Sequence, residues 1–266
     1  MKKTYPAEFL FQAVSLIVSL IVVHTFYVLL VRPNADVLLA QQASMMQVDK
    51  NYVQERSTWI IIRDFEQEAC FVLMFWAFAI MGYKGVTLAR ERKLLLEDLI
   101  PLHEGTKILP EDAREYARQI ESLPGWKYRA LLPRALLTAL RRFTATRSIP
   151  DVSGTAHGVC GAESERLESE LSMVRYIAWA IPSIGFIGTV RGIGEALGQA
   201  HKAVEGDIAG ITQSLGVAFN STFIALLISI VLMFLLHQLQ LQQERLVLDT
   251  DMYLDQHLIQ HLQVPS

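Results

Sequence analysis

The chain has 266 residues, 52% of them hydrophobic, and a mean hydropathy of +0.28, which together indicate a membrane protein. The net charge of −3 is close to neutral and argues against general binding of nucleic acids. The two cysteines lie in different surroundings, Cys70 in an apolar run and Cys160 in a Gly-rich polar stretch. We therefore expect two free thiols rather than a disulfide.

Two apolar runs occupy the first third of the chain. The run from Phe9 to Val31 exceeds the roughly 20 residues that a helix needs to cross a bilayer core, and we expect it to end at Pro33, Asn34 and Asp36. Acidic residues precede the second run and basic residues follow it, so the positive-inside rule places both chain termini in the cytoplasm. The predicted segments are a first transmembrane helix over residues 1–31, a periplasmic connection over 32–68 and a second transmembrane helix over 69–89.

Residues 90–175 are soluble in composition and predict a helical cytoplasmic domain. Pro110, followed by two acidic residues, indicates the start of a helix. A second helix is expected over residues 126–147, bent or broken near Pro133. The Gly/Ser-rich stretch 151–161 predicts a linker, after which a long helix begins at Ala162 and continues into the third span.

Residues 176–241 contain the predicted third and fourth transmembrane helices, and we expect them to form the functional core of the chain. Residues 242–266 follow as a helical cytoplasmic tail. Small and hydroxyl side chains recur at steps of three and four residues, which places them on one face of each helix. Such a face lets helix backbones approach closely or lines a narrow polar path. The rows are Gly185, Thr189, Gly192, Ala196 and Ala200 on the first helix, and Ser214, Ala218, Ser221, Thr222, Ala225 and Ser229 on the second.

The fold class that follows is an all-α membrane protein with four transmembrane helices. A helical cytoplasmic domain separates the second helix from the third, and the long third and fourth helices extend into the cytoplasm. The patterns HExxH, CxxC, GxSxG and the phosphate-binding P-loop do not occur in the sequence, so we expect no enzyme, no metal site and no cofactor.

Several polar positions within the spans allow two interpretations each. Arg191 and Glu195 are four residues apart and can pair on one helical face, either as a functional intramembrane pair or as a structural pair near the outer interface. His24 is either a proton-relay group or a neutral imidazole bonded to a neighbouring helix. The hydroxyls of Thr189 and Thr222 either line a path or bond to their own backbone. For Gly185, Gly188 and Gly192, helix packing is the favoured role.

The segment from Gly185 to Gly194, with Gly188-Thr189-Val190 at its centre, resembles the MotA/TolQ/ExbB proton-channel family. So do the segment from Ala218 to Ala225 and the spacing of about 33 residues between Thr189 and Thr222. Four spans with the soluble part between the second and third resemble the MotA arrangement within that family.

The resemblance implies a stator subunit of a motor driven by the proton-motive force in a bacterial inner membrane. It implies a ring of five copies around a dimer of a single-span, MotB/TolR/ExbD-like partner, whose membrane Asp accepts and releases protons. Thr189 and Thr222 would line the ion pathway, and Ser221 and Ser214 are further candidates for it.

Three matters stay open at this stage. A non-conducting scaffold that binds cytoplasmic proteins through residues 90–175 is the alternative function, and a secondary transporter is disfavoured because the sequence has no evident inverted repeat. The sequence does not distinguish protons from sodium ions. If the motor acts on a cytoplasmic rotor, the candidate docking residues are Arg90, Arg92, Glu97 and Asp98.

Overall fold

The computed structural model describes residues 5–48, 57–97, 99–100, 107–201 and 208–264 of the chain. The regular elements of this part are helices, and four helical stretches within it are long and apolar enough to cross a membrane. The all-α membrane class with four spans is thus confirmed. The chain divides into two compact units, Met1–Met81 with Met173–Leu236 and Gly82–Ser172 with His237–Ser266.

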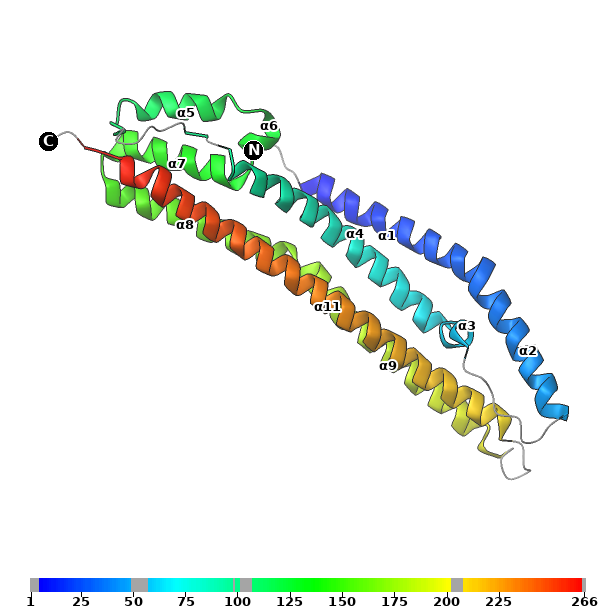
Figure 1. Cartoon of the computed structure of the whole chain (residues 1–266). Helices are drawn as coiled ribbons and strands as arrows, with labels where there is room; N and C mark the ends of the chain where they lie inside the picture. The colour runs from blue at the N-terminus through cyan, green and yellow to red at the C-terminus, as the bar shows by residue number, and fades with distance from the viewer. Residues whose placement is uncertain (1–4, 49–56, 98, 101–106, 202–207, 265–266) are drawn as a thin grey trace. The chain divides into compact units, whose positions relative to one another are not determined.

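The first unit begins with a long, nearly uninterrupted helical stretch (Figure 1). It consists of α1 (Tyr5–Phe26), a π-helical turn (Tyr27–Val31) and α2 (Arg32–Val48). The prediction that Pro33 ends the first helix is therefore wrong. Pro33 instead lies just after the π-helical turn, inside a helix that continues from α1 into α2. The preceding turn absorbs the change of register, since the Arg32 N–H donates to the carbonyl of Tyr27, five residues back.

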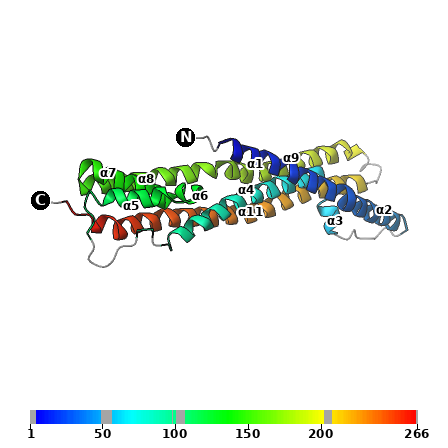
Figure 2. The same cartoon turned by 90° about the horizontal axis from the view of Figure 1, so that it is seen from above.

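Three further long helices contribute to the first unit. The short helix α3 (Thr58–Ile61) precedes α4 (Phe65–Leu94), which begins four residues before the predicted span. Val23, Tyr27 and Val31 are buried against aromatic and aliphatic side chains of α3 and α4. The remaining two are α9 (Ser172–Gly198) and α11 (Ala209–His257), which run side by side in both views (Figures 1 and 2).

The second unit is a helical bundle with its own core. Its elements are α5 (Ala113–Glu121), α6 (Gly125–Tyr128), α7 (Leu131–Thr146), α8 (Ile149–Glu170), the ends of α4 and α11, and a short 3₁₀ turn at Ile259–His261. Leu136, Leu140 and Phe143 of α7 are fully buried in this core. The tail contributes Leu254, Leu258 and Leu262 to the same core, and Leu246 is buried as well.

Of the two irregularities predicted for this unit, one is wrong and one is confirmed. The expected linker 151–161 is part of α8, whose first turn is capped by Ser148, with its Oγ accepting from the Asp151 N–H. Val152, Ala156 and Cys160 form a buried helical stripe, whereas Cβ atoms added at the glycines between them would meet open space. The break predicted near Pro133 is present: the stretch 126–147 is divided into α6 and α7 at Arg129 and Ala130, and Pro133 lies in the first turn of α7.

Candidate functional site

The site begins with a close contact between α9 and α11. Gly185, Gly188 and Gly192 are buried on the face of α9 that lies against α11. A Cβ atom at Gly192 would lie 2.7 Å from the carbonyl oxygen of Ser214 and 2.8 Å from the Cβ of Ala218, closer than real side chains approach. Only glycine fits at this separation of the two backbones, which places carbonyls of one helix within reach of hydroxyls on the other.

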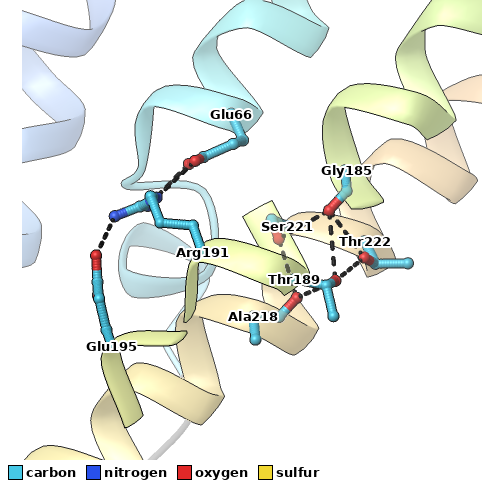
Figure 3. A network of polar contacts seen from close by, with 8 residues as sticks. All are labelled: Glu66, Gly185, Thr189, Arg191, Glu195, Ala218, Ser221 and Thr222. Atoms are coloured by element: carbon cyan, nitrogen blue, oxygen red, sulfur yellow. Dashed lines mark hydrogen bonds and ion pairs between the residues drawn. The ribbon is translucent and has the colours of Figure 1, made fainter. Parts of the chain in front are cut away.

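Thr189 of α9 and Thr222 of α11 form a hydroxyl pair within this contact (Figure 3). Their Oγ1 atoms are hydrogen-bonded to each other. Each threonine also lies 3.0 Å from a carbonyl oxygen of the opposite helix, Thr189 from that of Ala218 and Thr222 from that of Gly185. The two side chains are half-buried. The sequence thus predicted two adjacent hydroxyl faces, and the structure brings their threonines into direct contact.

The two serines that we also placed on the pathway lie differently. Ser221 is fully buried, and its Oγ can donate to the carbonyl of Ala218 at 2.9 Å or of Gly185 at 3.3 Å. It therefore shares its acceptors with the hydroxyl pair. Ser214 accepts from Gln199 Nε2 at 3.3 Å and lies eight residues before Thr222, about 12 Å along the helix at 1.5 Å per residue.

Arg191 joins two carboxylates beside the hydroxyl pair. Its NH1 donates to Glu195 Oε1 at 2.9 Å, as the spacing of four residues allows. Its Nε and NH2 donate to the two carboxylate oxygens of Glu66 at 2.7 and 2.9 Å, which is the bidentate geometry that guanidinium and carboxylate groups favour. Glu66 lies in the first turn of α4 and is buried, whereas Glu195 is exposed. Glu66 was not predicted in this role, because acidic residues before a span indicate its orientation without indicating a partner.

A second group of charges connects α1 and α2 to α4. His24 Nδ1 lies 2.7 Å from Glu68 Oε1, and Arg32 donates to the other oxygen of the same carboxylate. This is the arrangement of an imidazole bonded to a neighbouring helix, one of the two interpretations of His24. Just before α4, burial raises the pKa of the Asp64 carboxyl, and the nearby guanidinium groups of Arg191 and Arg63 oppose that rise.

The four candidate docking residues do not form one free surface. Arg92 is hydrogen-bonded to Gln242, and Glu97 accepts from Lys127 Nζ at 2.5 Å. Arg90 is exposed, and Asp98 lies outside the described residues. Two of the four charges therefore already have partners within the second unit.

The described residues contain no group of three or more His, Cys, Asp or Glu side chains that could hold a metal ion. Both cysteines are free thiols, as predicted, and both are buried.

A family model described as the MotA/TolQ/ExbB proton channel family matches residues 131–252. The matched range begins at the first residue of α7 and includes the hydroxyl pair, Arg191 and Glu195. No curated protein and no solved structure matches the chain.

Proposed function

We propose, since the chain belongs to the MotA/TolQ/ExbB proton channel family through residues 131–252, that it is the channel-forming subunit of a stator driven by the proton-motive force. The observation that carries this proposal is the hydroxyl pair, Thr189 with Thr222, held between two helices of one subunit. In the proposed assembly, a ring of five copies surrounds a dimer of a single-span, MotB/TolR/ExbD-like partner in a bacterial inner membrane, with both termini of each copy in the cytoplasm.

The hydroxyl pair has two ways to distribute its two hydrogens. If Thr222 donates to Thr189, the Thr189 hydroxyl can donate to the carbonyl of Ala218; if the order is reversed, Thr222 can donate to the carbonyl of Gly185. Both orders satisfy every hydrogen of the pair. The pair therefore has two neutral states of opposite polarity and can switch between them without leaving either hydrogen unpaired.

The pair needs a titrating group from elsewhere, because threonine hydroxyls do not ionise near neutral pH. Glu195 is the carboxylate that α9 carries, and it is engaged by Arg191. Proton relays in membranes generally use Asp, Glu or His. An Asp carried by the single-span partner meets this need, and its repeated protonation and release would drive motion of the partner within the ring.

The test is proton flux into liposomes that contain the chain together with the single-span protein that co-purifies with it. We expect Thr189→Val and Thr222→Val, which keep the side-chain shape and remove the hydroxyl, to reduce flux at least about tenfold each, a bound set below the roughly hundredfold effect of losing a general acid–base group. Thr212→Val is the matched control, because the Thr212 hydroxyl is exposed on α11 and donates to the carbonyl of Ile208, the residue just before this helix. Normal flux in both pathway variants would contradict the proposal and favour the scaffold. Repeating the assay with a sodium gradient identifies the ion.

A further inference from the structure

The charge of Arg191 presents a problem for a cation pathway. A guanidinium group stays protonated at any physiological pH, and Arg191 follows Thr189 by only two residues on α9. A unit charge about 10 Å away, at an effective dielectric constant of about 20, changes the local population of a monovalent cation on the order of tenfold. An uncompensated Arg191 would therefore deplete cations near the hydroxyl pair.

Glu66 lies where it compensates this charge. Its carboxylate takes two of the guanidinium's hydrogen bonds, and its side chain is about 10% exposed, against 46% for Glu195 on the other side of the same guanidinium. The buried partner is the stronger one, because its interaction is screened less by water and salt.

Gly188 allows this carboxylate to reach the contact of α9 with α11. A Cβ atom at Gly188 would lie 2.6 Å from Ser221 Cβ on one side and 3.1 Å from Glu66 Cγ on the other. The missing side chain therefore lets Glu66 of α4 and Ser221 of α11 approach the same point of α9. In Figure 3 the ion pairs extend from one side of α9 and the hydroxyl cluster lies on another.

We propose that Glu66 is a positioning residue that holds Arg191 against α4 and, with Glu195, gives this triad a net charge of −1 beside the pathway. The inference rests on the proposed function, since it assigns Glu66 a part in cation entry to the same hydroxyl pair. The net charge follows from two carboxylates and one guanidinium. In a purely structural role, the ion pair would only hold α4 against α9. Flux would then fall whether the negative or the positive member of the pair was neutralised.

Proton flux in the liposome assay separates the two roles, because neutralising Glu66 and neutralising Arg191 change the charge of the triad in opposite directions, whereas neutralising both leaves it unchanged. Glu66→Gln brings the triad to zero, and we expect flux to fall about tenfold. Arg191→Gln brings it to −2, and flux should stay at or above that of the unmodified chain. The double variant Glu66→Gln/Arg191→Gln returns the triad to −1 without any ion pair, and flux should recover to within about threefold, a residual that allows for changed packing. Glu66→Asp, which keeps the charge, should also retain flux.

The matched control is Glu68→Gln, which removes an equally buried carboxylate from the same turn of α4 but one that faces His24 and Arg32. We expect it to leave flux within about twofold. The inference is overturned if Glu66→Gln conducts normally or if the double variant is as slow as Glu66→Gln. If Glu66→Gln does not assemble, the comparison of Arg191→Gln with the double variant still tests the inference. Lower flux in Arg191→Gln than in the double variant would also overturn the inference.

The two threonine variants distinguish failure of this inference from failure of the proposed function. Normal flux in Thr189→Val and Thr222→Val would refute the proposed pathway itself. Reduced flux in those two variants combined with normal flux in Glu66→Gln would refute only the proposed role of Glu66 and leave the pathway in place.

Discussion

Two glycines of α9, only two residues apart, should respond in opposite ways to the same substitution. Gly192 lies against α11, where an added Cβ would meet the carbonyl oxygen of Ser214 at 2.7 Å and the backbone nitrogen of Ala218 at 2.8 Å. At Gly194 an added Cβ would meet nothing within 4 Å. Gly192→Ala should therefore destabilise the first unit, and Gly194→Ala should stabilise it.

The size of the difference can be worked out from these contacts. Both substitutions gain about 1 kcal/mol of helix propensity, so this contribution cancels when the two variants are compared. What remains is the overpacking at Gly192, about 1–3 kcal/mol, because the atoms in the way belong to the backbone of α11 and cannot rotate aside. In a chain of this size each kcal/mol shifts the unfolding temperature by about 2–4 °C. We expect the Gly192→Ala protein to unfold at least about 2 °C below the Gly194→Ala protein.

The measurement is thermal unfolding of the detergent-solubilised chain, followed by circular dichroism for both variants under the same conditions. Equal unfolding temperatures would show that α9 and α11 can separate enough to admit a methyl group. The glycine contact would then no longer fix the distance between the hydroxyls of Thr189 and Thr222, and the geometry on which the proposed pathway depends would fail with it.

Three other outcomes can be checked on the same preparation. Glu163→Gln removes the buried carboxylate that pairs with Arg134 and Arg166 and should lower the free energy of unfolding of the second unit by about 2 kcal/mol in chemical denaturation. Arg141→Ala, in an exposed pair, should change the same free energy by less than about 1 kcal/mol. Asp64→Asn should stabilise the first unit at pH 7, because the folded-state pKa of Asp64 is raised above its unfolded value and stability is lost as the pH rises through the folded pKa. The advantage should shrink in thermal unfolding as the pH falls below that pKa; a constant advantage would contradict this. Cys70 and Cys160 should resist a water-soluble maleimide in the folded chain and react on unfolding, and rapid labelling of either would show that its unit opens.

The fold was predictable where a physical length or period fixes it. A bilayer core demands runs of about 20 apolar residues, and the four spans follow from that demand. The errors fell where a residue was taken as a helix breaker by type alone. Pro33 follows a π-helical turn that accommodates it within a continuous helix. The glycines of 151–161 lie on the open side of a helix whose buried stripe, beginning at Val152, keeps its period.

The site was predictable only as far as one helix face can be deduced from its own sequence. Small and hydroxyl residues at steps of three and four place Thr189 and Thr222 on faces that must find a neighbour, and each proved to be the other's neighbour. Glu66 and Arg191 are 125 positions apart, and no periodicity within a helix connects residues on separate elements. What the sequence does contain is the unfavourable energy of a guanidinium at a membrane position, which requires a partner. Because Glu195 offers a partner in the same helix, nothing in the sequence indicated a second carboxylate. An exposed i,i+4 pair is nevertheless too weak to stabilise such a charge alone. A charged residue in a span should therefore be expected to have a buried partner on another helix even where a sequence-local partner is available.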